Sequence, residues 1–150
     1  MSADVSLDVA LGDTRALRAK LDELGDALSK KILAATAGEV EEYVEGQSAL
    51  HNKTGALVRS VFKAKRGDGW AVGHDMQHAP HARFVHWGTK RHVILPKNKK
   101  ALRFVGAGGL FVFAKKVNHP GNKPDKWLER AAAMAPAIFA RRVAEKMRTI

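Results

Sequence analysis

Four of the seven histidines lie close together in the sequence, and such a cluster raises the possibility of a metal site. They are His74, His78, His81 and His86. Zinc takes three or four ligands in a tetrahedral arrangement, and Asp75 is the only acidic residue beside the cluster. The spacing matches no established zinc motif, and Pro80 interrupts any helix that would align the rings. We therefore expect polar surface or interface histidines, with no bound metal.

The residues that other catalytic chemistries require are absent or scattered. A metal-dependent nuclease needs clustered carboxylates. The acidic residues after position 50 are instead well separated: Asp68, Asp75, Asp125, Glu129 and Glu145. There is no Gly-x-Ser-x-Gly elbow and no Gly-x-x-x-x-Gly-Lys phosphate loop, and the chain has no cysteine. These observations predict a protein that is not an enzyme and that needs no cofactor.

A dense group of cations is the stronger candidate for a binding site. Six of them lie within fourteen positions: Lys90, Arg91, Lys97, Lys99, Lys100 and Arg103. Such a patch attracts phosphates without sequence preference, and it equally suits an acidic protein surface. It could also be a solvated loop. We expect a docking surface for protein, with nucleic acid as the alternative.

The elements that must position these cations read as β-structure. The residues His92–Leu95 predict a strand that stops at Pro96, and two more strands are expected at Ala101–Val105 and Leu110–Lys115. Gly106-Ala107-Gly108-Gly109 lies between the last two strands and predicts a hairpin tip. Along the last strand Phe111 and Phe113 share one face, whereas the other face carries Leu110, Val112 and Ala114. One face should meet the core and the other a neighbouring subunit; the alternative is that the helices bury both faces.

Helices are expected at both ends of the chain. A stripe of aliphatic residues predicts a helix over 13–46, weakened at Gly25 and divided at Gly38: Leu17, Leu21, Leu24, Leu28 and Ile32. A second helix should start at Pro124 and be kinked or split at Pro136. Its apolar stripe is Trp127, Ala131, Met134, Ile138 and then Val143 or Met147.

The central part predicts short elements. A polar connection over 46–55 should lead into a short helix through about Ser60, capped by Thr54 or Asn52. A β-hairpin should follow, with strands at Val61–Lys65 and Trp70–Gly73 around a Gly-Asp-Gly turn. The residues from Ala79 to Trp87 predict a further short helix that a left-handed Gly88 ends, with Phe84, Val85 and Trp87 buried.

Bulk properties fit a single domain over 1–150, with a flexible N-terminus at 1–12 and a C-terminal docking extension at 136–150. The net charge is +11, but residues 1–50 carry five Lys and Arg against ten Asp and Glu, so nearly all the positive charge lies after them. Such polarity suits self-assembly through oppositely charged faces. No apolar run reaches the roughly 20 residues that span a bilayer, and no signal peptide is apparent.

Three phrases occur in an order and spacing that resemble a known family. They are Asn52-Lys53-Thr54-Gly55-Ala56-Leu57-Val58-Arg59-Ser60-Val61, then His81-Ala82-Arg83-Phe84-Val85-His86-Trp87-Gly88-Thr89, then His119-Pro120-Gly121-Asn122-Lys123-Pro124-Asp125-Lys126-Trp127-Leu128-Glu129-Arg130-Ala131. The chain is similar over roughly residues 40 to 135 to the tail-component family of long-tailed phages, the lambdoid gene-ten-like neck and tail-completion proteins. Two histidines, His81 and His86, replace the tyrosine and the acidic residue that are frequent there.

The resemblance implies an α+β fold in which the N-terminal helix and a kinked C-terminal helix pack on a small, mostly antiparallel sheet with hairpins. It implies a structural virion protein of the head–tail junction, assembled in the host cytoplasm as an oligomeric ring, with six copies as the natural expectation. Its partners would be other copies, neighbouring neck and tail-tube proteins and, in passing, genomic DNA. A tail terminator is an alternative, as is a non-specific nucleic-acid-binding protein. Eight positions would define the fold: Gly55, Phe84, Trp87, Gly88, Pro120, Gly121, Trp127 and Leu128.

Overall fold

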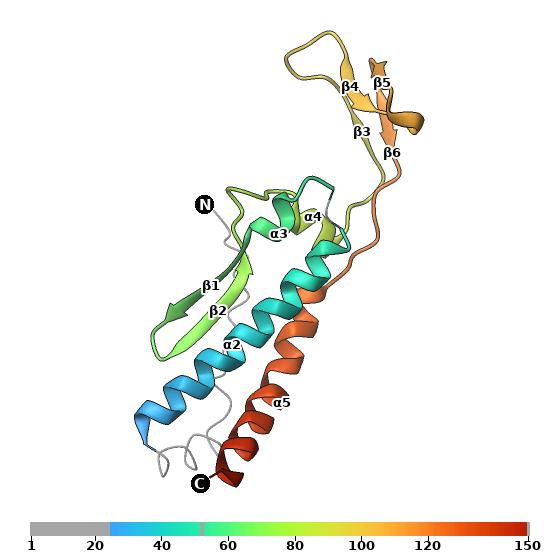
Figure 1. Cartoon of the computed structure of the whole chain (residues 1–150). Helices are drawn as coiled ribbons and strands as arrows, with labels where there is room; N and C mark the ends of the chain where they lie inside the picture. The colour runs from blue at the N-terminus through green and yellow to red at the C-terminus, as the bar shows by residue number, and fades with distance from the viewer. Residues whose placement is uncertain (1–24, 52, 150) are drawn as a thin grey trace.

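Two long helices form the frame of the molecule. The computed structural model describes residues 25–51 and 53–149. Helix α2 (Asp26–Ala49) and helix α5 (Trp127–Arg148) lie side by side along most of their length (Figure 1). Because the two helices come from opposite ends of the described chain, their packing closes the body of the protein.

A β-hairpin and two short helices complete this body. Strands β1 (Val61–Arg66) and β2 (Gly69–His74) pair antiparallel and pack against α2. The turn between them contains the expected glycines, so this predicted hairpin is confirmed. Helix α3 (Ala56–Arg59) precedes the hairpin and helix α4 (Ala82–Trp87) follows it. The core between these elements is mainly aliphatic, with one large aromatic ring: Val40, Val44, Leu57, Val72, Ala79, Ala82, Trp127, Leu128, Ala131, Ala135 and Ile138.

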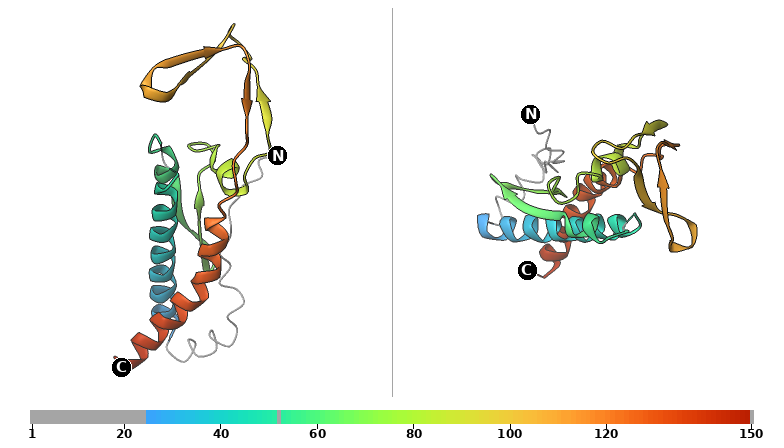
Figure 2. Two further views of the ribbon diagram at one scale, coloured as in Figure 1. Left: turned by 90° about the vertical axis from the view of Figure 1, so that its right-hand side faces the viewer. Right: turned by 90° about the horizontal axis from the view of Figure 1, so that it is seen from above.

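The remaining strands leave the body as a projecting arm. We define the arm as residues 89–122, which hold β3 (His92–Ile94), β4 (Leu102–Val105), the turn η2 (Ala107–Gly109), β5 (Phe111–Ala114) and β6 (Val117–His119). The views in Figures 1 and 2 show these strands standing beyond one end of the helix pair. The chain is therefore α+β, as expected, but its strands form three separate two-stranded antiparallel sheets instead of one small sheet under the helices.

The first helix differs from its prediction at both ends. Gly25 has non-helical backbone and α2 begins after it, so a continuous helix over 13–46 is wrong. Residues 13–24, with Leu17, Leu21 and Leu24, and the expected flexible segment 1–12 lie outside the described residues. The helix runs through Gly38 without a break and ends at Ala49, so it includes the first four residues of the expected connection at 46–55. Packing against α5 and β2 outweighs the roughly 1 kcal/mol that a helical glycine costs.

The last helix is one element, so the expected split at Pro136 does not occur. It begins at Trp127 and not at Pro124, so the predicted start of this helix is wrong. Trp127, Ala131, Ile138 and Val143 are buried as expected, together with Leu128, Ala135 and Phe139. Met134 is exposed, which contradicts the expected stripe, and of the two alternatives for its last position Val143 is buried whereas Met147 is exposed. The segment from 136 to 148 belongs to α5, and Phe139 and Val143 pack with Ile32 of α2. It is therefore part of the body, and no separate docking extension is found at these positions.

Helix α4 also departs from expectation. It starts at Ala82, and its aromatic residues are only half-buried, with Trp87 46% exposed and Phe84 similar. The prediction that both rings fill the core is therefore wrong. Gly88 ends the helix with a positive φ of 75°, but its ψ of 171° is extended and not left-handed helical. None of the described helices has the length and apolar character needed to cross a membrane.

Candidate functional site

The arm is joined to the body at a short, strongly hydrogen-bonded root. Thr89 and Asn122 form an antiparallel bridge in which each backbone N–H donates to the other carbonyl, with N···O distances of 3.0 and 3.1 Å. The Thr89 hydroxyl donates to the Asn122 side-chain oxygen at 2.6 Å. The Asn122 amide in turn donates to the carbonyl of Phe84 on α4 at 3.0 Å. These bonds fix where both ends of the arm leave the body.

Two glycines make this close approach possible. Gly88 and Gly121 flank the bridge and have φ angles of 75° and 81°, which L-residues with side chains rarely adopt. A Cβ at Gly121 would collide with the Thr89 carbonyl oxygen, and a Cβ at Gly88 would lie 2.8 Å from the Asn122 carbonyl oxygen. Both positions were expected to define the fold, and the root supplies the physical reason.

Beyond the root the arm is a long, interrupted hairpin. In its first ladder β3 pairs with β6, and the rings of His92 and His119 stack with centroids 4.9 Å apart. In its second ladder β4 pairs with β5, and Arg103 lies opposite Phe113 while Val105 lies opposite Phe111. Strand β6 was not anticipated, because its three residues carry no clear alternation.

Both faces of the second ladder carry exposed apolar side chains. One face holds Val105, Phe111 and Phe113, with the two phenyl rings 60% and 68% exposed. The other face holds Phe104 and Val112, which are also exposed. The expectation that both faces are apolar is thus confirmed, but neither face meets the core of the body, so the prediction that one of them would do so is wrong. An isolated two-stranded hairpin is marginally stable in water. Contiguous exposed apolar surfaces such as these usually mark sites where a protein binds another molecule.

The arm is also strongly basic. It contains eight Lys and Arg and no Asp or Glu: Lys90, Arg91, Lys97, Lys99, Lys100, Arg103, Lys115 and Lys116. Within the described residues none of these cations forms an ion pair. The guanidinium of Arg103 lies 4.7 Å from the centre of the Phe111 ring. Every predicted docking residue, from Lys90 to Phe113, lies on this one arm. The sequence analysis did not include Lys115 and Lys116 among the docking residues. The absence of Asp and Glu over the 34 residues of the arm is the signal that could have added them.

A buried polar cluster lies in the body beneath the root. The Trp127 indole N–H donates to Nε2 of His74 at 3.0 Å, so the other nitrogen, Nδ1, carries the proton and donates to the Ser60 hydroxyl at 2.8 Å. The Ser60 hydroxyl in turn donates a hydrogen bond to the Leu57 carbonyl oxygen at 2.6 Å. Burial lowers the pKa of His74 to about 4. This cluster therefore holds neutral groups in a fixed arrangement and stabilises the core.

The second buried histidine is less well partnered. His86 packs edge-on against Trp87 and Trp127, with ring centroids 4.6 and 5.2 Å away. Neither of its ring nitrogens has a hydrogen-bond partner among the described residues, and burial lowers its pKa. His78 pairs instead with Asp75 at 2.5 Å on the surface. Across residues 25–51 and 53–149 no group of three potential metal ligands converges.

Two groups of ion pairs connect the two long helices and the segments beside them. Glu39 on α2 accepts hydrogen bonds from Arg141 and Arg142 on α5. The carboxyl of Asp125, just before α5, receives bonds from His51 and Arg130, and the bond from His51 holds its pKa below the usual range. Each of the two carboxylates is bonded to two basic side chains, which is the arrangement of structural ion pairs.

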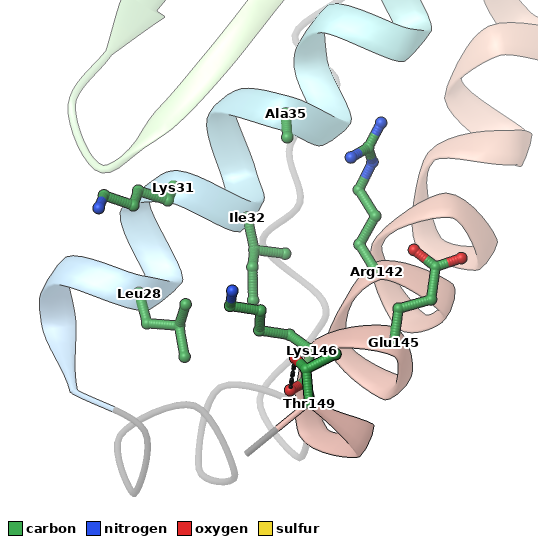
Figure 3. A pocket seen from close by; sticks show the side chains of 8 residues that line it. All are labelled: Leu28, Lys31, Ile32, Ala35, Arg142, Glu145, Lys146 and Thr149. Atoms are coloured by element: carbon green, nitrogen blue, oxygen red, sulfur yellow. Dashed lines mark hydrogen bonds between the residues drawn. The ribbon is translucent and has the colours of Figure 1, made fainter.

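An open pocket of about 340 Å³ lies between the start of α2 and the end of α5 (Figure 3). Its floor is aliphatic, from Leu28, Ile32 and Ala35, and its rim is charged. Arg142 on that rim is engaged with Glu39. No nucleophile with an adjacent base lies among its lining residues, so the pocket offers no catalytic arrangement.

Comparisons with protein families, with curated proteins and with solved structures give no match. The resemblance to the phage tail-component family therefore depends on the three sequence phrases alone. All three phrases contribute to one region of the structure. The first contains α3, the second contains α4 and the first half of the root, and the third contains the second half of the root and the start of α5.

Proposed function

We propose that this chain is a structural protein of the phage head–tail junction, which completes or caps the upper end of the tail tube as part of an oligomeric ring. The arm is the single observation that carries this proposal. A stiffly rooted hairpin with two exposed apolar faces and eight cations is suited to dock on a neighbouring molecule. The buried groups of the body are neutral or paired, which favours a scaffold over a catalyst.

Support also comes from where the family-like phrases lie. Their residues make the root of the arm and the core directly beneath it, including Gly88, Gly121 and Trp127. Such residues set the direction in which the arm leaves the body. In a protein that works by shape, that direction determines which neighbour the arm reaches.

The test is the composition of phage particles made in cells that carry this gene. Mass spectrometry of purified particles should detect the chain, and electron microscopy should place it as a ring at the neck. Removal of the gene should leave heads and tails that do not join. Particles that lack the protein, or that assemble normally without it, would exclude this function.

A charge-reversed variant sharpens the test. Lys99→Glu with Lys100→Glu changes two exposed residues of the loop between β3 and β4, far from the core. This variant should fold normally but fail to restore joined particles. The matched control is Lys30→Glu with Lys31→Glu, which makes the same change on the exposed face of α2. A normal yield of infectious particles from the Lys99 and Lys100 variant would contradict docking through this loop.

Nucleic-acid binding is the second candidate, and the unpaired cations of the arm favour it. Each phosphate that the arm neutralises would make affinity fall steeply with salt. A filter-binding titration with duplex and single-stranded DNA over a range of salt concentrations decides between the two. No retention at low ionic strength would remove this alternative.

A further inference from the structure

The outer side of α2 carries a second surface without a partner. Glu42, Glu45, Gly46, Ala49 and Leu50 are all exposed and recur at helical spacing, so they form one stripe. We call these five residues the α2 stripe. It lies on the side of the helix opposite Val40, Val44 and Ser48, which are buried in the body.

The chemistry of the α2 stripe complements that of the arm. Its carboxylates are unengaged: whereas Glu39 pairs with Arg142 and Glu41 pairs with Lys63, neither Glu42 nor Glu45 forms an ion pair within the described residues.

The stripe also has a suitable shape. Open space lies beyond Gly46, and Ala49 is small, so another molecule can approach the helix backbone closely there. Leu50 lies beside these two residues and is 73% exposed. The stripe thus combines negative charge with an accessible apolar surface.

We propose that the arm of one copy docks on the α2 stripe of a second copy of this chain. The face with Arg103, Phe111 and Phe113 supplies both the apolar part and the charged part of the contact. The phenyl rings would cover the small residues Gly46 and Ala49 and the side chain of Leu50. The Arg103 guanidinium would meet the carboxylates of Glu42 and Glu45. This inference rests on the proposed ring, for which it specifies the interface.

The direction of the arm makes the contact intermolecular. The arm leaves the body at the Thr89–Asn122 bridge and stands beyond the end of the helix pair, with its outer hairpin bent to one side in the left view of Figure 2. Its strands pair with one another and make no substantial contact with α2. Because the two surfaces lie on different parts of one copy, the contact joins unlike patches, and repetition of such a contact builds a ring or a filament.

A nucleic acid would use the same arm less completely. Phosphates would engage Arg103 and the loop lysines but would leave Val105 and Leu110 exposed, and Leu110 is the most exposed apolar residue of the arm. The α2 stripe offers both negative charge and apolar area. A second copy therefore satisfies more of the arm's surface than a phosphate backbone does.

The test uses two variants of the full chain, each lacking one surface. The arm variant carries Phe111→Ser and Phe113→Ser, and the stripe variant carries Glu42→Lys and Glu45→Lys. All four residues are exposed, so both variants should keep the circular dichroism spectrum of the native chain. Mass is measured by light scattering after size-exclusion chromatography. The native chain should assemble beyond a dimer, whereas each variant alone should remain at the chain mass of 16.4 kDa.

Mixing the two variants gives the sharpest result. The arm variant keeps an intact stripe and the stripe variant keeps an intact arm, so the mixture can form one native contact and then stop. We expect a heterodimer of one copy each, at twice the chain mass. Asp26→Lys is the control for charge reversal on α2, since it reverses an exposed acid on the same helix outside the stripe, and it should assemble like the native chain.

Three results would overturn the inference. These are a native chain that stays monomeric at its highest soluble concentration, a stripe variant that assembles like the native chain, and a mixture that contains monomers only. If DNA shifts the native chain and both variants alike, and none of the three assembles without DNA, the arm is a nucleic-acid site instead, because both variants keep its eight cations. The proposed function fails separately, when particles lack the chain. If particles contain the chain but substitutions in the stripe do not affect its assembly, the proposed interface is refuted while the proposed function stands.

Discussion

His74 shows how a polar residue can stabilise a core without taking part in chemistry. It lies at the centre of the body, accepts a hydrogen bond from Trp127 and donates one to Ser60. Both bonds require the neutral ring with its proton on Nδ1. A second proton would add a positive charge in a buried place and would remove the acceptor that Trp127 needs.

The first prediction is a loss of stability in mild acid. In the unfolded chain the pKa of His74 has its ordinary value near 6.5, whereas in the folded protein it is about 4. The unfolded state therefore binds the proton more readily, so this stability is complete above pH 6.5 and is lost as the pH falls towards 4. The loss should reach about 3 kcal/mol, and urea unfolding across this range measures it. His74→Gln should flatten the pH profile, whereas an unchanged profile in that variant would assign the loss to other groups.

The second prediction separates two tryptophans that the sequence treats alike. Trp127 is fully buried and hydrogen-bonded, so Trp127→Ala should lower the free energy of unfolding by about 3 to 5 kcal/mol. Trp87 is half-exposed, with the Lys126 ammonium over its ring at 5.2 Å, and Trp87→Ala should cost about 1 kcal/mol. Urea denaturation of both variants checks this. Equal losses would mean that α4 packs more deeply than described.

The two rings also show what sequence could not determine at the scale of residues. Helical spacing correctly predicted burial of Trp127, Ala131 and Ile138, since a long helix shows its inner face as a repeating pattern. Helix α4 has six residues, so it is too short to show which face is inside. Phe84 and Trp87 were expected in the core on size alone, and tertiary packing placed them at its edge.

At the scale of elements, hairpins were the most predictable parts. Glycine-containing turns between β-prone segments correctly indicated β1–β2 and β4–β5, because turn chemistry is local. The continuity of α2 through Gly38 and of α5 through Pro136 was not predictable locally. Keeping a helix intact through a glycine or a proline costs a few kcal/mol at most, and the packing of the two helices against each other exceeds that cost. Where the arm would point depended on long-range contacts at its root.

The third prediction concerns that root. Gly121→Ala would place a Cβ against the Thr89 carbonyl, so the bridge should open and the arm should lose its fixed direction. Hydrogen exchange should rise over residues 90–120, while the core around Trp127 keeps its protection. Gly108→Ala is the matched control, since Gly108 also has a positive φ, of 83°, but nothing within 4 Å of its Cβ position. Equal exchange in both variants would show that backbone strain, and not the close approach, governs the root.

At the scale of the whole molecule, the protein divides into a stable body and a dependent arm. All residues of both apolar clusters lie outside 89–122. The arm carries eight cations and most of the exposed large apolar side chains. The charge pattern of the sequence was divided at residue 50 and not at the arm; the cluster of cations from Lys90 to Arg103 marked part of the arm, but it did not show that this part projects from the body. The body therefore supplies stability, and the arm supplies the surface that we propose for assembly.

The last prediction tests this division directly by removing the arm. Thr89 and Asn122 form a pair in which both backbone N–H groups donate across the bridge, and this pair can be closed by a two-residue turn. Replacement of residues 90–121 by Asn-Gly should therefore leave a folded body. Its urea midpoint should stay close to that of the full chain, because no residue of either apolar cluster is lost. The shortened protein should remain monomeric and should show no affinity for DNA in low salt. If it instead unfolds or aggregates, the arm contributes to the stability of the body, and the separation between scaffold and docking element would have to be abandoned.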